Sequence, residues 1–142
     1  MSTVKDFATA FNRQDVDGLL ACFTEAATYA DTFYGEHRGR AGLRALFERM
    51  FREGKDYGWA MDVIVESADR AAAEWTFSYV VSDAVARSAG RRVRFRGMSL
   101  FELTGGKISA YREYFDSGVA LLQLGFSPES LGKVLRRRLD RG

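Results

Sequence analysis

The sequence predicts a single α+β domain whose helices pack on one side of a curved, mainly antiparallel sheet. Two observations lead to this fold class. Apolar residues recur at helical spacing in the first third of the chain, and from residue 56 to residue 116 they alternate with polar ones. Helices followed by a meander of strands are typical of α+β domains. A length of 142 residues suits one domain with a sizeable core.

Three helices are expected, two before the first strand and one after it. The run from Thr3 to Asp6 resembles a capping box at the start of the first helix. A second, short helix is expected from Val16, after a break at residues 12–15. The third helix has the clearest apolar stripe, and Gly54 follows its end. The apolar positions of the three helices are Val4, Phe7, Ala8 and Phe11; Val16, Leu19, Leu20 and Phe23; and Leu43, Leu46, Phe47, Met50 and Phe51.

The strands are expected to present an inner face to these helices. The first strand is expected over residues 27–33 and a loop over residues 34–39. The pair Gly105-Gly106 is expected to form the turn into the last strand. Side chains of a strand alternate between the two faces of the sheet. The inner face is therefore predicted to carry Tyr29, Asp31, Phe33, Trp59, Trp75, Phe77, Tyr79, Ser99, Phe101, Tyr111 and Glu113, with Phe7 and Phe11 above it.

The remaining organisation is simple. We expect one domain over residues 1–126 and a basic tail over residues 127–142, in which Ser127 and Pro128 have the N-cap and first-position preferences of a short helix. The opposite sheet face mixes apolar and polar residues, which predicts a homodimer formed through this outer face. Its apolar members are Ile64, Val80, Met98 and Leu100.

Composition and charge exclude several classes of partner. The net charge of +2 is too small to indicate a nucleic-acid partner. The basic runs 91–96 and 136–138 have the pattern of solvated surface. No apolar run is long enough to predict a membrane span, and residues 1–6 lack a signal-peptide pattern. The single cysteine, Cys22, excludes an internal disulfide and fits a reducing compartment. We therefore expect a cytoplasmic protein.

Two carboxylates are the candidate catalytic groups. Asp31 and Glu113 are predicted to share an apolar cavity rich in aromatic rings, which is typical of a small-molecule site for a flat or bulky apolar ligand. Because two carboxylates in a dry pocket do not both ionise cheaply, one pKa is expected to rise toward neutrality. Two structural interpretations stay open: Asp31 caps the following turn, or Glu113 pairs with an arginine.

No metal or cofactor is expected. His37, the only histidine, lies in the predicted loop, and it has no cysteine or acidic residues at ligand spacing. No glycine-rich phosphate loop is present. The turn 39–42, which opens the third helix, is only a weak pattern for an anion site.

Several short motifs resemble the nuclear transport factor two-like superfamily, and within it the SnoaL-like proteins. They are the segments Phe11–Leu19, Phe23–Tyr29, Gly39–Leu43 and Phe101–Ile108. The resemblance covers about the first 125 residues. It implies a cone-shaped α+β barrel, with three N-terminal helices on a strongly curved sheet and a pocket between them.

The resemblance suggests three chemistries, and each lacks some of its family's residues here. Asp31 matches the general base of ketosteroid isomerases, whereas Phe7 and Ser99 occupy the positions of their oxyanion-hole Tyr and Asp. Phe7 donates no hydrogen bond and Ser99 is a much weaker acid. Because removing one such donor costs several kcal/mol, ordinary ketosteroid isomerisation is not expected.

The other two chemistries both point to Glu113. Relative to limonene epoxide hydrolases, Tyr29 matches a Tyr that holds the water and Glu113 matches the final acid. Trp75 and Phe77 replace the Arg and first Asp, and Asp31 stands where the Asn is expected. Relative to the SnoaL-like polyketide cyclases, Glu113 matches the catalytic acid, while Ser99 takes the place of a His. Of the three chemistries, the cyclase reaction depends least on the residues that are replaced here.

The resulting hypothesis is a cofactor-independent enzyme of the SnoaL-like kind. It uses acid/base chemistry (cyclisation, isomerisation or hydration) on an apolar polyketide-, steroid- or terpene-like metabolite, with Asp31, Glu113 and Tyr29 as catalytic residues. One alternative is a non-catalytic ligand-binding domain, and another is a structural dimerisation module with a closed pocket. The expected ligand-binding residues are Phe7, Phe33, Trp59, Trp75, Phe77, Tyr79, Ser99, Phe101 and Tyr111.

Overall fold

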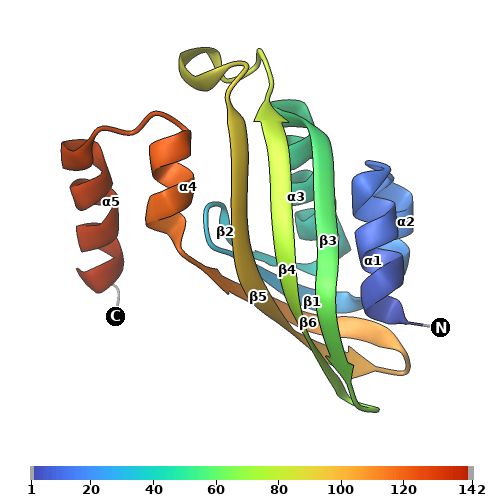
Figure 1. Cartoon of the computed structure of the whole chain (residues 1–142). Coiled ribbons are helices and arrows are strands. Elements are labelled where there is room, and N and C mark those ends of the chain that lie inside the picture. Colours follow the sequence, from blue (N-terminus) through green and yellow to red (C-terminus); the bar gives the residue numbers. More distant parts are fainter. Residues whose placement is uncertain (1, 141–142) are drawn as a thin grey trace.

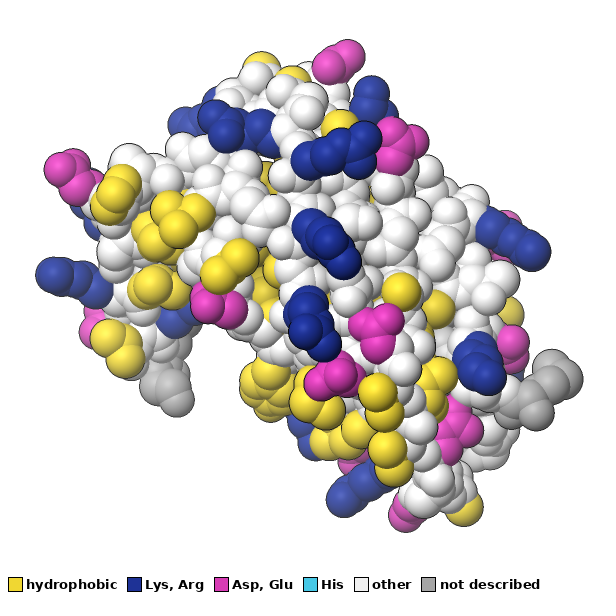
Figure 2. Space-filling view, viewed as in Figure 1, with side chains coloured by type: hydrophobic (Ala, Val, Ile, Leu, Met, Phe, Trp, Pro, Cys, Tyr) yellow, Lys and Arg dark blue, Asp and Glu magenta, His cyan; other side chains and the backbone are white. Residues whose placement is uncertain are grey.

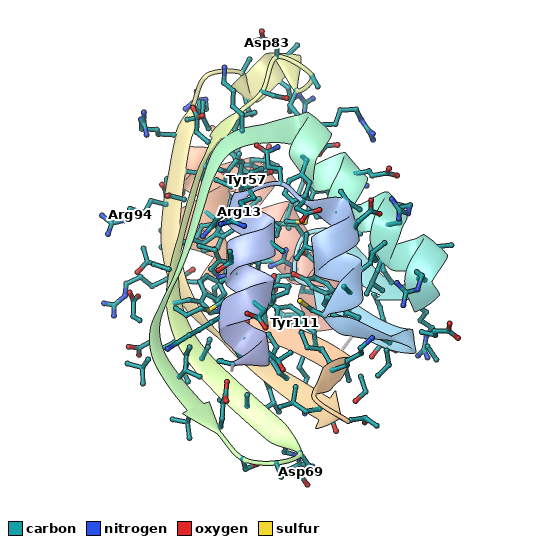
Figure 3. The ribbon with its side chains drawn as sticks, turned by 90° about the vertical axis from the view of Figure 1, so that its right-hand side faces the viewer. Arg13, Tyr57, Asp69, Asp83, Arg94 and Tyr111 are labelled. Carbon is teal, nitrogen blue, oxygen red and sulfur yellow. The ribbon has the colours of Figure 1, made fainter. Side chains whose placement is uncertain are left out.

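A six-stranded, strongly curved sheet wraps around three helices in the computed structural model, which describes residues 2–140 (Figure 1). Figure 3 shows the long strands bending around these helices, which fill the concave side. The elements are α1 (Thr3–Asn12), α2 (Val16–Ala21), β1 (Phe23–Asp31), β2 (Gly35–Arg38), α3 (Gly39–Glu53), β3 (Gly54–Glu66), β4 (Arg70–Val81), a 3-10 turn (Ala86–Ser88), β5 (Arg92–Thr104), β6 (Lys107–Phe115), α4 (Ser117–Gln123) and α5 (Pro128–Asp140).

The strand order is β2-β1-β6-β5-β4-β3. Every neighbouring pair is antiparallel except β1 and β6, which run parallel. The predicted α+β class with a mainly antiparallel sheet is therefore confirmed. The parallel pair places the ends of β1 and β6 side by side, and these ends carry Asp31 and Glu113.

Several predicted boundaries were wrong for local reasons. Helix α1 is capped by Ser2, whose hydroxyl accepts from the Lys5 N–H at 3.3 Å, so its cap lies one residue before Thr3. Phe23, expected in the second helix, begins β1. Residues 35–38, expected in a loop, pair with β1, which places His37 opposite Tyr29.

Helix α4 was not predicted. Its N-cap is Asp116, whose side chain accepts from the Val119 N–H at 3.3 Å. Helix α5 begins at Pro128, and the Ser127 hydroxyl accepts from the Ser130 N–H at 3.1 Å. Figure 1 shows α4 and α5 beside the sheet, on the side away from α1 and α2. None of the helices formed by residues 2–140 is long and apolar enough to cross a membrane.

A β-bulge in β3 changes which of its side chains face inward. The register shifts between Met61, opposite Trp75, and Val63, opposite Glu74. An extra residue of this kind reverses the alternation beyond it. Uninterrupted alternation would place Val63 and Val65 on the same face as Trp59, but both are exposed, and Ile64, predicted outside, packs against the core.

The core is built largely of aromatic rings. Phe7 and Phe11 of α1 are fully buried, and their centroids lie 5.1 Å and 4.9 Å from the Trp59 ring in edge-on contacts. Such T-shaped contacts are the favoured geometry of aromatic pairs. Figure 3 shows Tyr111 in this layer between helices and sheet, while Arg94 points away from it on the outer face.

The outer face carries exposed apolar side chains among charges. Figure 2 shows hydrophobic groups gathered over the lower part of the sheet, beneath a column of basic side chains, and a second group over the helices at the left. Val63, Val65, Met98 and Tyr114 are exposed on strands, and Val119, Leu122, Leu135 and Leu139 are exposed on α4 and α5.

Gly97 makes room for the rings beneath β5. It pairs with Trp75 on one side and Phe115 on the other. A Cβ atom at Gly97 would lie 2.6 Å from the Trp75 ring and 2.8 Å from the Phe115 Cβ. Glycine at this position therefore lets the Trp75 indole lie across the neighbouring strand.

Gly97→Ala is expected to destabilise the protein by about 1–3 kcal/mol, because the added methyl displaces the Trp75 ring from a packed core. Urea denaturation measures this change. Gly42→Ala is the matched control: it lies inside α3, and the nearest atom to an added Cβ is 3.9 Å away. That variant is expected to be neutral or up to about 1 kcal/mol more stable. Equal stability of the two variants would contradict the packing argument.

Candidate active site

A small inner cavity lies between the sheet and α3. Its volume is about 40 Å³, which is room for about three water molecules. Both candidate carboxylates are in its wall, and the rest is mostly aromatic. The lining residues are Asp31, Phe33, Tyr34, Met50, Tyr57, Trp59, Trp75, Phe77, Tyr79, Phe95, Glu113 and Phe115.

The predicted site residues divide into two layers. Those in the cavity wall are Asp31, Glu113, Phe33, Trp59, Trp75, Phe77 and Tyr79. The others lie outside the cavity wall, buried in the core, and these are Tyr29, Phe7, Ser99, Phe101 and Tyr111. The buried layer therefore acts on the cavity only through the residues in the wall.

Sequence reasoning missed five lining residues. Phe95, Tyr57 and Phe115 lie two or four positions from predicted residues on the same strand face, so alternation could have found them. Tyr34 and Met50 come from the turn after β1 and from α3. Only the folded arrangement brings these two to the cavity.

A chain of three hydrogen bonds connects Trp75, Ser99 and Tyr111 to Glu113, and each residue donates to the next one toward Glu113. The Trp75 Nε1–H donates to the Ser99 hydroxyl at 2.8 Å, Ser99 and Tyr111 hydroxyls lie 2.8 Å apart, and Tyr111 donates to Glu113 Oε1 at 2.7 Å. An indole N–H only donates, and the Tyr111 proton is already used. Ser99 must therefore accept from Trp75 and donate to Tyr111, so every donor in the chain points toward Glu113.

The Glu113 carboxyl group has no cation as a partner among residues 2–140. The ion pairs of this part of the chain do not include Glu113, so the alternative in which it pairs with an arginine is not observed there. Burial raises the pKa of Glu113 to about 8, and the nearby charge of Asp31 adds to the rise. The bond from Tyr111 and a second from the Thr32 N–H at 3.2 Å oppose it. Glu113 is thus largely protonated at neutral pH.

Asp31 lines the cavity and also caps a turn. Its Oδ1 accepts from the Phe33 N–H at 2.7 Å and the Tyr34 N–H at 2.9 Å. Burial raises the pKa of Asp31, and these two backbone bonds counteract the rise because they favour the carboxylate. Its other oxygen, Oδ2, makes no hydrogen bond to residues 2–140. A ligand proton can therefore reach that oxygen.

Tyr29 is placed differently from the prediction that it is catalytic. It is fully buried outside the cavity wall, stacked on Tyr111 with ring centroids 4.1 Å apart. Burial, reinforced by the charge of Glu113, raises the pKa of Tyr29 far above its ordinary value. Its hydroxyl has no hydrogen-bond partner among residues 2–140. In this position Tyr29 supports Tyr111 and does not touch the cavity.

Trp59 has a buried donor group without a partner. It is in the cavity wall, and its buried Nε1–H has no partner within the described chain. Buried polar groups are normally hydrogen-bonded, so an exception in a cavity wall calls for an explanation such as a ligand or a water. His37 stays outside the site, where its Nδ1 lies 3.1 Å from the Gly35 carbonyl.

The two carboxyl groups are arranged for proton transfer. Asp31 and Glu113 form a pair of carboxyl groups with unequal environments in one apolar cavity. Such a pair holds a single proton over a range of pH, with one member able to accept a proton and the other able to donate one. Separately, residues 2–140 contain no group of three His, Cys, Asp or Glu side chains placed to hold a metal ion.

Comparison with known families decides where the chain belongs. The SnoaL-like domain profile matches residues 4–111, which is most of the chain. This protein is a member of the SnoaL-like domain family. The resemblance found in the sequence motifs is thereby confirmed. The comparison with curated protein sequences found no match.

Solved structures agree with this fold. A proposed polyketide cyclase from Pseudomonas putida KT2440 is 25% identical to this SnoaL-like protein, with a TM-score of 0.76 over 87% of this chain and 98% of the other. A limonene-epoxide-hydrolase-like epoxide hydrolase from M. tuberculosis is 21% identical, with a TM-score of 0.71 over 95% and 93%. A Catenulispora acidiphila protein with a ketosteroid isomerase-like fold, solved with trimethylamine, is 17% identical, with a TM-score of 0.77 over 88% and 93%.

Glu113→Gln is expected to reduce the loss of stability that the SnoaL-like protein shows as pH rises. The pKa of Glu113 is about 8 in the folded state and near 4.5 when solvated. Between these values the folded protein keeps a proton that the unfolded chain has released, so the free energy of unfolding falls as pH increases. At about 1.4 kcal/mol per pKa unit, the variant should lessen this loss by about 2 kcal/mol or more.

Urea denaturation at about pH 5 and pH 8.5 measures the effect. Glu74→Gln, the same substitution on the outer face of β4, controls for the loss of one surface carboxylate. An identical pH dependence in the wild type and Glu113→Gln would show that the Glu113 carboxyl ionises normally.

Proposed function

We propose that this SnoaL-like protein is a cofactor-independent enzyme that moves protons on an apolar small molecule, in an isomerisation, hydration or cyclisation. One observation carries the proposal: two carboxyl groups, of the buried Asp31 and the half-buried Glu113, line one aromatic cavity, and no ion pair within residues 2–140 includes Glu113. A carboxyl group whose pKa is raised by burial, next to a second one that is stabilised as an anion, is the usual arrangement for acid/base work near neutral pH.

The two groups take different roles. Asp31 is the base, because two backbone N–H groups stabilise its carboxylate and its Oδ2 is free. Glu113 is the acid, because it keeps its proton up to about pH 8. Tyr111 and the Thr32 N–H fix the Glu113 carboxyl in position. Tyr29 acts indirectly, by packing against Tyr111.

The reaction class follows from these roles. Asp31 removes a proton from a carbon next to a carbonyl group, and the C–H electron pair becomes the double bond of an enol. Glu113 gives its proton to the carbonyl oxygen, where the charge would otherwise develop. In an isomerisation, a conjugated enol takes the proton from Asp31 at a different carbon, and the enol hydroxyl returns its proton to Glu113. In a cyclisation, the enol carbon attacks a second carbonyl carbon of the same molecule, the new alkoxide takes the proton from Asp31, and the enol hydroxyl returns its proton to Glu113. The buried Trp59 Nε1–H is available to a ligand oxygen in either case.

The similarity to solved proteins supports this class without naming a substrate. The Pseudomonas putida relative is a proposed polyketide cyclase, and an epoxide hydrolase shares the fold. The replacements at Trp75 and Ser99, which remove an arginine and a histidine expected from related chemistries, are compatible with proton transfer. In this chain those two residues form the donor chain to Glu113.

A non-catalytic ligand-binding domain is the second candidate. The observation that favours it is the small inner cavity, which Trp75 and Phe77 help to fill. A binding domain requires the cavity but not the ionisation of its carboxyl groups. Substitution of both acids separates the two candidates.

Deuterium exchange into the methyl group of 2-acetylnaphthalene, followed by NMR, measures proton removal next to a carbonyl. The wild type is expected to exceed the buffer rate, with a pH profile that falls above about pH 8 as Glu113 loses its proton. Asp31→Asn should lower the protein-dependent rate by about 100-fold or more, since a positioned base contributes about 10²–10⁴-fold. Glu113→Gln should lower it by about tenfold and remove the fall at high pH.

Asp62→Asn is the control, because it makes the same change on the exposed outer side of β3. Trp59→Phe is expected to raise KM for the ketone and to leave the pH profile unchanged. If the wild type does not exceed buffer, or if Asp31→Asn is as active as the wild type, the enzyme proposal fails and the binding domain is favoured.

The outer sheet face supports the proposal of a homodimer. Val63, Val65, Met98 and Tyr114 are exposed there, which is unusual for apolar side chains on neighbouring strands. Sedimentation velocity is expected to show a dimer at micromolar concentration, and Met98→Lys should shift it toward monomer. A wild type that sediments as a monomer at about 100 μM would contradict this interface.

A further inference from the structure

A second, larger chamber adjoins the inner cavity. Its volume is about 370 Å³, within the range of small-molecule sites, and it shares four wall residues with the inner cavity. Its outer walls come from α4, α5 and the turn between β4 and β5. The lining residues are Phe33, Tyr34, Glu53, Tyr57, Tyr79, Val81, Val85, Arg87, Ser88, Leu121, Leu124, Phe126, Val134 and Arg138.

The two chambers differ in size and charge. The inner cavity admits only a small group, so the body of any ligand that reaches Asp31 and Glu113 has to occupy the outer chamber. The outer chamber is mostly apolar and contains two arginines, Arg87 and Arg138, and one acid, Glu53. A ligand that spans both chambers would place one end near the carboxyl groups and the other near the arginines.

The arginines are not neutralised within the described chain. Glu53 is already engaged, because it accepts from Arg49 Nε at 2.9 Å and from the Tyr34 hydroxyl at 2.9 Å. The ion pairs of residues 2–140 include neither Arg87 nor Arg138. The outer chamber therefore has an excess of positive charge.

Arg138 is the better placed of the two. It is half-buried, and its guanidinium donates to two neutral acceptors, the Ser117 hydroxyl and the Thr32 carbonyl, the latter at 3.3 Å. Thr32 also donates its N–H to Glu113. Thr32 thus lies between Arg138 and Glu113, and Arg138 lines the outer chamber but not the inner cavity. Arg87 is exposed on the 3-10 turn and can contribute less.

Arg138 is held by polar contacts with neutral groups. No residue of α5 is buried, and Leu139 is 78% exposed. A guanidinium with neutral partners and remaining N–H groups is well suited to an anionic group, because it binds carboxylate or sulfonate oxygens in pairs.

We propose that the outer chamber binds the anionic group of an amphipathic ligand, with Arg138 as the main anchor and Arg87 as a second contact, while the apolar end points to the inner cavity. The substrate class is then an apolar acid with rings, rather than a neutral metabolite. This inference deepens the proposed acid/base function, since it identifies which end of the ligand reaches Asp31 and Glu113.

Two fluorescent probes with the same ring system test the inference. 8-Anilinonaphthalene-1-sulfonate carries an anionic group, and N-phenyl-1-naphthylamine lacks it. Arg138→Gln is expected to weaken binding of the sulfonate about tenfold and to change binding of the neutral probe less than about twofold, since only a charge-assisted contact is lost. Arg87→Gln should have a smaller effect in the same direction, and the double variant the largest.

Two further variants separate charge from structure. Arg137→Gln makes the same change on α5 outside the chamber, and it should leave both affinities unchanged. Ser117→Ala removes one contact of Arg138 but keeps its charge, and it should preserve the preference for the sulfonate. If Arg138→Gln weakens both probes equally, or neither, or if Arg137→Gln has the same effect, the inference is wrong. Because neither probe is turned over, this outcome is independent of the ketone exchange assay.

Discussion

Burial of the Glu113 carboxyl group among aromatic rings, without a cation, is the constraint on which the rest of the site depends. An ionised carboxylate in such surroundings is costly, so the group keeps its proton well above its usual pKa. Within the described chain, hydrogen-bond donors lower the free-energy cost of ionising Glu113. Tyr111 and the Thr32 N–H donate to the carboxyl oxygens. Ser99 in turn donates to Tyr111, and Trp75 donates to Ser99. Because Asp31 is nearby, the ionisation of either acid affects the other.

The aromatic framework and this hydrogen-bond chain depend on each other. Trp75 reaches Ser99 because Gly97 leaves the space above β5 free. Tyr111 is held against Tyr29 and the Phe7 ring of α1, which fixes the hydroxyl that contacts Glu113. Trp75 and the other rings of the cavity wall limit the inner cavity to a small group, so in our proposal the body of a ligand lies in the outer chamber.

Much of the fold could be predicted from the sequence, because alternation and helical spacing are local signals. The inward position of Asp31 and Glu113 followed from alternation alone. The bulge after Met61 could not be predicted from the sequence, since an extra residue in one strand is recognised only when the pairing with the neighbouring strand is known. For the same reason the contact between Trp75 and Ser99 could not be predicted: it depends on the register of β4 and β5. The outer chamber also requires α4 and α5, whose positions beside the sheet are a property of the folded arrangement.

Direct titration of the Glu113 carboxyl tests the central claim. Carbon-13 NMR of the protein labelled at glutamate side-chain carboxyls, with Glu113→Gln to assign the signal, gives its pKa without reference to any substrate. We expect a value of about 8 in the wild type and a lower value in Asp31→Asn, where the neighbouring charge is gone. A titration near 4.5 in both proteins would contradict the account, because Glu113 would then be an ordinary solvated acid and not the proton donor of an apolar site.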